Sequence, residues 1–261
     1  MADASPLSWI ARDFEAHCLT LARGLSGREL LLRLGCSAED LLDVGDHGQA
    51  DALRWDGDHY WDWGIAHSGE KESWAFALEP ASVWASDSAR LAAASRDTAV
   101  LCTSSADAMT CVAYWENGEL VTAFEDMAAE KRHEGGGVDP DRLVDQMRRV
   151  GLFDPARATR LGVGLDLLYE VTGVTLTPDD VSIGLAGKLP AFDDDSDESD
   201  ESDESDGADG ADEPGQIAAT DGAGAGGGVV IGPVGGPPTT GRWVSGGRVS
   251  HGLGGQLDSA F

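Results

Sequence analysis

Met109 to Glu125 reads M-T-C-V-A-Y-W-E-N-G-E-L-V-T-A-F-E, and this stretch decides the fold. Two runs rich in β-branched and aromatic residues, 109–116 and 119–125, flank the dipeptide Asn117-Gly118. Asn-Gly is the strongest short hairpin signal, because both central residues of a type I′ turn need positive φ. The stretch therefore predicts an antiparallel β-hairpin.

A two-residue loop fixes the register of this hairpin and of its neighbours. It places Trp115 opposite Leu120 and Cys111 opposite Phe124.

A further strand over 99–104, followed by a loop over 105–108, would bring Cys102 opposite Cys111. A disulfide between these two is sterically feasible, but the sequence favours reduced, buried thiols. No C-x-x-C spacing links the four cysteines, which are Cys18, Cys36, Cys102 and Cys111.

Two more segments upstream carry strand patterns. Residues 17–24 are predicted to form a strand, and residues 61–65 and 74–78 alternate aromatic with smaller residues on either side of 68–71, which predicts a second hairpin. Its aromatic residues Tyr60, Trp61, Trp63 and Trp74 are expected in the core. If one face is exposed, they form a candidate surface for a partner.

Helix signals occur at both ends of the folded region. Ser5-Pro6 predicts a helix start, and Ser26 with Glu29 forms a capping box for a helix over 28–34. An Ala-rich helix is expected over 86–96. Asp139-Pro140 and Asp154-Pro155 repeat one start signal, an Asp cap before a proline at the first helical position.

The fold class that follows is α+β, with an antiparallel sheet of about five strands and helices packed mainly on one face. Seven of the eight tryptophans lie within residues 1–190, which we predict to form a single domain. Residues 191–213 are an Asp/Glu/Ser-rich segment and 214–261 a Gly/Pro-rich tail. Both are predicted to be disordered, because they lack the apolar residues needed to offset the entropy of ordering the backbone.

The chain is strongly acidic, with a formal net charge of -29. Thirteen acids and no base lie between Asp193 and Glu213, and the remaining residues still carry -16. Such a charge repels phosphate backbones and anionic lipid, so no direct nucleic-acid binding is expected and a basic protein is the expected partner. We found no signal-peptide pattern and no apolar run long enough to span a membrane, so a cytoplasmic protein is expected. The sequence leaves the oligomeric state open.

Several segments together resemble an actinobacterial domain-of-unknown-function family, serial number 6461, over about residues 8–185. The opening carries E-A-H-C-L-T-L-A-R-G-L-S from Glu15 and E-L-L-L-R-L-G from Glu29. Later landmarks follow in the same order: S-W-A-F-A-L-E-P from Ser73, N-G-E-L-V-T-A-F-E from Asn117, D-P-D-R-L-V-D-Q-M from Asp139 and L-T-P from Leu176. The resemblance implies one bacterial cytosolic domain and transfers no catalytic residue.

Region 43–67 is the richest in side chains that bind metals or transfer protons. Its members are Asp43, Asp46, His47, Asp51, Asp56, Asp58, His59, Asp62 and His67. The spacing fits neither H-E-x-x-H nor a calcium loop, so a solvated Asp-rich loop is favoured over a site. Alternation from Trp61 would place His59 and His67 on one side of a strand.

Other motifs fail for lack of the right context. Gly222, Gly224 and Gly227 match G-x-G-x-x-G by letters but follow no predicted strand. Gly187-Lys188 lacks both the first glycine and the final Ser/Thr of a P-loop. His17 adjoins Cys18, but neighbours on a strand point to opposite faces. The sequence therefore predicts no cofactor and no metal site, and it identifies no catalytic residue.

Three hypotheses for the function remain. The leading one is a non-catalytic protein-interaction module, regulatory or immunity-like, whose acidic surface and tail engage a basic partner. The alternatives are an uncharacterised enzyme or metal-binding protein that uses region 43–67, and a nucleic-acid mimic. The mimic requires regularly spaced carboxylates on the folded body.

Overall fold

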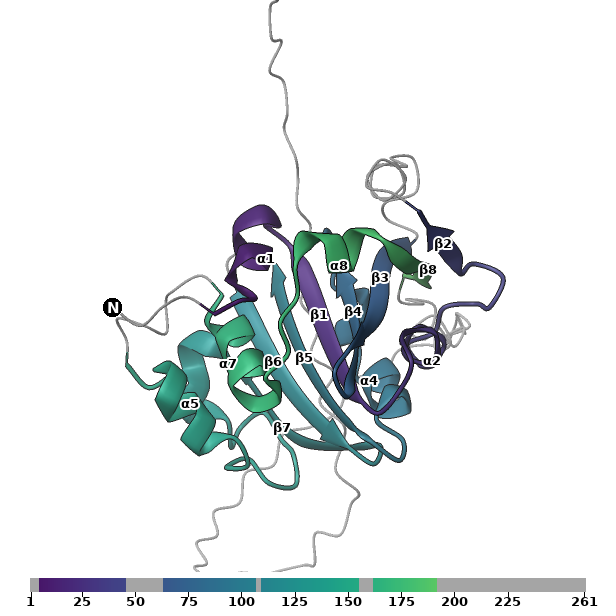
Figure 1. Ribbon diagram of the computed structural model, residues 1–261. Helices are drawn as coiled ribbons and strands as arrows, with labels where there is room; N and C mark the ends of the chain where they lie inside the picture. Colours follow the sequence, from purple (N-terminus) through teal and green to yellow (C-terminus); the bar gives the residue numbers. More distant parts are fainter. Residues whose placement is uncertain (1–4, 46–62, 107–108, 155–161, 192–261) are drawn as a thin grey trace, which may run out of the picture. The chain divides into compact units, whose positions relative to one another are not determined.

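The computed structural model describes residues 5–45, 63–106, 109–154 and 162–191 (Figure 1). One antiparallel sheet organises these residues, with the strand order β2-β8-β3-β4-β1-β5-β6-β7. The strands are β1 (His17–Arg23), β2 (Leu42–Val44), β3 (Trp63–Lys71), β4 (Trp74–Glu79), β5 (Ala99–Ala106), β6 (Met109–Glu116), β7 (Glu119–Glu125) and β8 (Gly184–Pro190).

The α-helices are short. They are α1 (Ser8–Asp13), α2 (Gly27–Arg33), α4 (Ser88–Ala94), α5 (Val144–Val150), α7 (Val163–Thr172) and α8 (Pro178–Ser182). Two 3₁₀ segments, η1 (Trp84–Ser86) and η2 (Asp126–Lys131), complete the list. The α+β class and the antiparallel sheet are confirmed. The expected number of about five strands is wrong, because the described sheet has eight.

The two unexpected strands, β2 and β8, carry weak local signals. β2 has three residues, and β8 contains Gly184, Ala186 and Gly187, which have low strand propensity. β8 forms because β3 lies beside it, with Ile65 opposite Lys188 and His67 opposite Ala186. Pairing of this kind joins segments that are distant in the chain, so no local pattern of residues predicts it.

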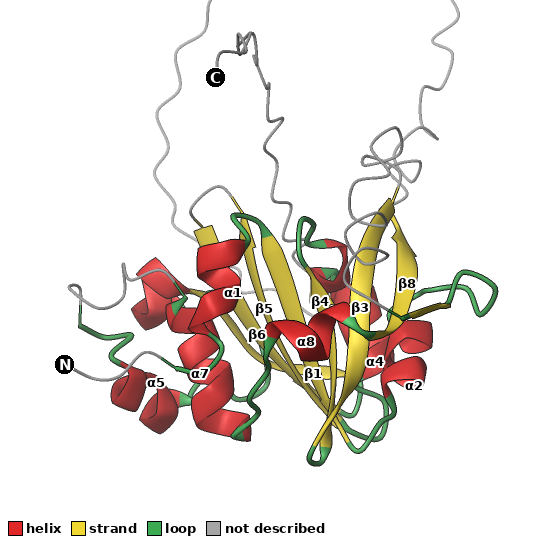
Figure 2. Cartoon of the chain, turned by 45° about the horizontal axis from the view of Figure 1, so that its top comes forward, coloured by secondary structure: helices red, strands yellow, loops and turns green. Residues whose placement is uncertain are grey.

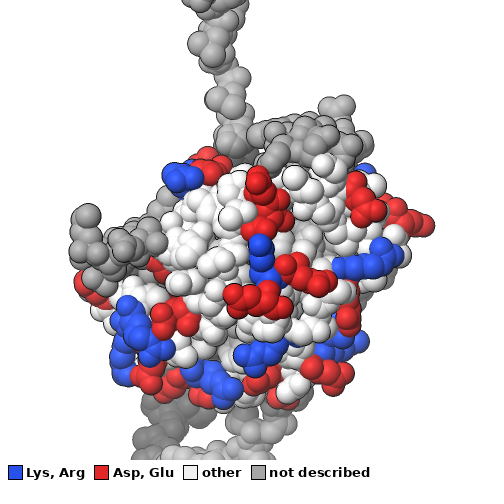
Figure 3. Space-filling model, in the orientation of Figure 1, with Lys and Arg blue, Asp and Glu red and all other residues white. Residues whose placement is uncertain are grey.

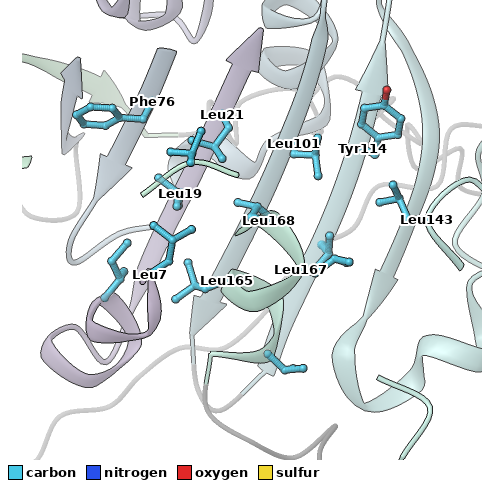
Figure 4. Close-up of a cluster of buried hydrophobic side chains, with 14 of the residues drawn as sticks. Leu7, Leu19, Leu21, Phe76, Leu101, Tyr114, Leu143, Leu165, Leu167 and Leu168 are labelled. Carbon is cyan, nitrogen blue, oxygen red and sulfur yellow. The ribbon is translucent and has the colours of Figure 1, made fainter. Parts of the chain in front are cut away.

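Large side chains fill one face of the sheet. Leu19 and Leu21 of β1 share this face with Phe76 and Leu101, and all four are almost fully buried. Helices α1, α5 and α7 cover it, and Figure 4 shows Leu165, Leu167 and Leu168 of α7 over the side chains of the strands. This is the larger core, and it is the face on which helices were expected.

Small side chains line the opposite face. Cys18, Ala22, Ala77 and Cys102 lie there, packed against Leu30 and Leu31 of α2, Leu34 at the end of that helix, and Leu91 of α4. Figure 2 shows helices on both sides of the sheet. The expectation that helices pack mainly on one face is therefore wrong, because short side chains let α2, α4 and η1 form a second covering layer.

The Asn117-Gly118 turn is confirmed, with φ of 54° and 84° at its two residues. Trp115 lies opposite Leu120 as predicted, but a β-bulge follows. One extra residue in β7 moves Phe124 opposite Val112, and Cys111 faces Glu125 instead.

Two loops are shorter than the sequence suggested. β5 and β6 pair as far as Ala106 and Met109, so Cys111 lies opposite Ser104 and not opposite Cys102. β3 continues through 68–71 to Lys71, and the turn falls at Glu72, whose φ is 56°. In both hairpins the strands extend into residues that have no strong strand propensity of their own.

Helix starts and ends follow the predicted signals in part. Ser26 accepts a hydrogen bond from the Glu29 backbone N–H (3.1 Å), as the predicted cap requires. Gly151 ends α5 in the left-handed conformation, but α5 begins at Val144, after irregular turns that follow Asp139-Pro140. The proline of the second signal, Pro155, lies outside the described residues.

Gly164 allows α7 to lie directly on β5 and β6. A Cβ atom there would lie 2.5 Å from Thr103 Oγ1 and 2.9 Å from Thr110 Cγ2. The helix can approach the sheet this closely only because residue 164 has no side chain.

We predict that Gly164→Ala destabilises the protein by about 1–3 kcal/mol, the usual cost of overpacking a core. Alanine is the better helix former by about 1 kcal/mol, so helix propensity alone predicts the opposite sign. Urea unfolding measures the difference. Combining Gly164→Ala with Thr103→Ala should cost less than the sum of the two single changes, and simple additivity would refute the proposed clash.

Candidate functional site

The Asp/His region does not form a site within the described residues. Asp46, His47, Asp51, Asp56, Asp58, His59 and Asp62 lie outside them. Asp43 lies on β2 opposite Leu185, which pairs with Ser68. His67 lies opposite Ala186, one position further along. Because successive strand residues alternate between faces, Asp43 and His67 lie on opposite faces of the sheet.

His67 is also a core residue, with only 3% of its surface exposed. In the parts of the chain that the structure describes, no three His, Cys, Asp or Glu side chains are grouped as a metal site would require. Residues 46–62 lie outside the described part of the chain, so an enzyme or metal protein that uses region 43–67 stays a prediction.

The four cysteines are free thiols. The sulfur of Cys18 lies 3.4 Å from that of Cys102, both in the interior. Hydrogen bonding to Cys102 and burial raise the pKa of Cys18 well above its ordinary value, and burial raises the pKa of Cys36 to about 12 and of Cys111 to about 11. These three side chains stay protonated at neutral pH, whereas a catalytic cysteine needs a thiolate.

The aromatic hairpin is largely structural where it is described. Trp74 is 5% exposed, with the Arg23 guanidinium 5.1 Å from its ring centroid. Trp63 is half-buried beneath Lys188, whose ammonium lies 4.4 Å from the ring centroid. Tyr60 and Trp61 lie outside the described residues. Trp74 is therefore a core residue, as expected, and the described part offers no open tryptophan face.

Gly187-Lys188 is part of β8, so it forms no phosphate-binding loop. A Cβ on Gly187 would lie 2.8 Å from the sulfur of Cys36, which shows that the glycine is needed for packing beneath α2. Gly222, Gly224 and Gly227 of the second glycine motif lie outside the described residues.

One carboxylate is fully buried, and its role is structural. Glu79 accepts hydrogen bonds from Ser82 Oγ (2.6 Å) and from the backbone N–H groups of Trp84 (2.9 Å) and Ala85 (2.7 Å). Burial raises the pKa of Glu79, and these hydrogen bonds together with the nearby Arg90 charge oppose that rise. Glu79 thereby attaches η1 to the end of β4.

Carboxylates gather at one exposed place, around α8 and the β3–β4 turn. We call the group of Glu72, Asp179 and Asp180 the α8 acidic patch. Glu70 precedes Lys71 on β3 and therefore points to the other face of the sheet, where its carboxylate accepts a hydrogen bond from the Gly27 backbone N–H (3.1 Å). Lys71 joins the two elements through its ammonium, 2.6 Å from Asp180 Oδ1. Figure 3 shows acidic side chains along the middle of this face, over α8 and below it.

The geometry of the patch keeps its charges in place. Partial burial acts to raise the pKa of Asp180, but hydrogen bonds from Lys71 and Thr177 outweigh burial and lower that pKa. Thr177 and Asp180 form a capping box that fixes the start of α8. The residue that follows α8, Ile183, is apolar and 47% exposed.

Sequence reasoning did not find this patch. The T-P-D-D sequence at 177–180 is a recognisable helix start, but Lys71 and Asp180 are far apart in the chain. Only the packing of α8 beside β3 brings them together. The patch can bind cationic side chains, because carboxylates accept charge-assisted hydrogen bonds from Lys and Arg.

A buried imidazole makes the stability of the fold depend on pH. His17 is 2% exposed, and its Nδ1 lies 3.1 Å from the carbonyl oxygen of Phe14. Burial lowers the pKa of His17, and the bond to Phe14 offsets this only in part. The folded chain therefore takes up this proton at a lower pH than the unfolded chain does.

We predict that the free energy of unfolding falls as pH drops through about 6.5, the pKa of an exposed histidine. In that range the unfolded state binds the proton and the native state does not, so the slope approaches about 1.4 kcal/mol per pH unit at most. The loss ends at the lower pKa of the folded state. Urea unfolding of wild type and His17→Gln between pH 8 and pH 5 checks this, and equal slopes for the two proteins would contradict it.

Comparison with known proteins gives one match. The model of a family of unknown function, DUF6461, matches residues 4–182. No curated protein and no solved structure matches the chain. Among the described residues, no helix has the length and apolar character needed to cross a bilayer. Because the match spans more than half of the sequence, the chain belongs to the DUF6461 family.

Proposed function

We propose that this protein is a non-catalytic protein-interaction module, regulatory or immunity-like, whose acidic surface and tail engage a basic partner. The observation that carries the proposal is the α8 acidic patch, where the Lys71 ammonium lies 2.6 Å from Asp180 Oδ1 and the neighbouring residues Glu72 and Asp179 are exposed acids. The tail sequence adds thirteen acids between Asp193 and Glu213.

The arrangement of the patch supports recognition more than catalysis. A charged rim beside an exposed apolar side chain is the usual composition of a protein interface, and Ile183 supplies the apolar part. Complementary charge mainly speeds encounter and selects partners, and it acts over about 8 Å at physiological salt. A basic protein is therefore the partner class that this surface fits.

The interior supports the same proposal by its chemistry. Three of the thiols have raised pKa values, and the buried carboxylate of Glu79 is occupied by three hydrogen bonds. These three thiols and this carboxylate thus serve packing and the attachment of η1. A function that works through the surface needs none of them.

We predict that the tail contributes to binding through its charge. In a full-length variant, the thirteen acids of 193–213 become Asn or Gln, so length is kept and charge is lost. Affinity capture from the native cytosol, at about 0.05 M and about 0.15 M salt, compares this variant with wild type. Loss of a basic, salt-sensitive partner from the variant is the expected result. Equal recovery of that partner by both proteins would remove the tail from the proposal.

A second prediction tests the patch itself. Glu72→Lys combined with Asp179→Lys reverses two exposed charges and keeps both partners of the Lys71–Asp180 ion pair. We expect the affinity for the basic partner to fall about tenfold or more, mainly through slower association. Glu39→Lys combined with Glu130→Lys, two exposed acids in other elements, is the matched control for net charge. If both double variants bind equally well, total charge and not the patch governs recognition.

A further inference from the structure

A hollow of about 500 Å³ beside α5 is lined mainly by charged side chains. Four of them are arginines in a chain whose net charge is -29. Figure 3 shows Lys and Arg side chains gathered at the lower left, over α5. The lining residues are Arg132, Asp141, Arg142, Val144, Asp145, Gln146, Arg148 and Arg149.

Arg132 forms a fixed part of the hollow. Its guanidinium contacts Asp141 Oδ1 through Nη2 (2.5 Å) and the Ala129 carbonyl oxygen through Nη1 (3.4 Å). It also lies over the ring of Phe153, 5.6 Å from the centroid. Only 15% of the Arg132 side chain is exposed. A positive charge is therefore held in one geometry before any ligand arrives.

The other three arginines are exposed by half or more. Arg142 lies 3.7 Å from Glu116, Arg148 lies 3.0 Å from Asp145, and Arg149 lies 2.5 Å from Glu170. The pair of Arg148 and Asp145 is the most exposed, at 66% and 77%. Exposed ion pairs contribute little to stability, so a ligand can replace Asp145 at low cost.

These internal pairs decide which ligand the hollow can select. A ligand with a single carboxylate would make the same contact to Arg148 that Asp145 already makes. Asp145 lies in the same helix, so its effective concentration at Arg148 is high and such a ligand does not displace it. A phosphoryl group carries close to two negative charges and three acceptor oxygens, and guanidinium groups bind it in a bidentate manner. It can contact several arginines at once, whereas Asp145, Glu116 and Glu170 are each paired with one arginine of the hollow.

We propose that the hollow beside α5 binds a phosphoryl group, with Arg142 and Arg148 as the ligand-binding arginines and Arg132 as a fixed charge behind them. The volume is within the range of pockets that hold small organic ligands. The site is separate from the α8 acidic patch and does not depend on the proposed basic partner. The same chemistry is available from a phosphorylated small molecule and from a phosphoserine side chain.

Titration of the full-length protein with pyrophosphate, followed by calorimetry and by NMR of the arginine side chains, tests the site. We expect saturable binding, and we expect Arg148→Ala and Arg142→Ala each to weaken it about tenfold, as the loss of a charge-assisted hydrogen bond predicts. Arg12→Ala is the matched control, because Arg12 is an exposed arginine paired with Asp13 (2.8 Å) in α1. It should leave the affinity unchanged.

Asp145→Asn gives the opposite expected change. It removes the carboxylate that competes for Arg148, so pyrophosphate should bind several-fold more tightly. Circular dichroism and urea unfolding of each variant show whether the fold is kept. Opposite effects of neighbouring substitutions on one affinity cannot arise from a loss of structure.

Two further ligands identify the source of the phosphoryl group. Tighter binding of a nucleoside triphosphate than of a phosphoserine peptide indicates a small-molecule ligand, and the reverse order indicates a modified protein. Three results would overturn the proposal: no saturable binding of pyrophosphate, equal affinity of wild type and the two arginine variants, or equally tight binding of a tricarboxylate.

Discussion

Strand β1 has no face turned to water, and the rest of the structure is arranged around that constraint. It pairs with β4 on one side and β5 on the other, and each residue from His17 to Ala22 is buried. Leu19 and Leu21 require a thick apolar layer on one face, which α1, α5 and α7 supply. Cys18 and Ala22 allow a close layer on the other, which α2, α4 and η1 supply. A strand covered on both faces needs helices on both, whatever their order in the chain.

The second layer depends on buried polar contacts as well as on apolar packing. Glu79 attaches η1 to β4 through three hydrogen bonds, and Ser68 Oγ lies 3.0 Å from the Gly27 carbonyl oxygen, which attaches the start of α2 to β3. A polar group in such a place is tolerated only when its hydrogen bonds are made. These contacts explain why a carboxylate and a serine lie within otherwise apolar layers.

The surface carries the features from which function was inferred. The α8 acidic patch and the arginine hollow lie on different elements and present opposite charges, so they suit different ligands. Both combine a side chain held in place with others that are exposed: Asp180 is held in the patch, and Arg132 is held in the hollow. Fixed groups reduce the entropy lost on binding, whereas exposed groups exchange partners readily.

The sequence by itself determined those elements whose signals are local. Asn117-Gly118 fixed a hairpin because its backbone requires positive φ, Ser26 fixed the start of α2, and Gly151 fixed the end of α5. The sequence also placed Trp74 in the core and gave the overall α+β class. What it did not contain was β8, the second helical layer, the contact between Cys18 and Cys102, or either charged site. Most of these join segments far apart in the chain, as Lys71 and Asp180 show. The arginine hollow is built from residues 132–149, but it depends on the turns that bring Arg132 to Asp141. Such contacts depend on how complete elements pack, and local patterns of residues do not encode that packing.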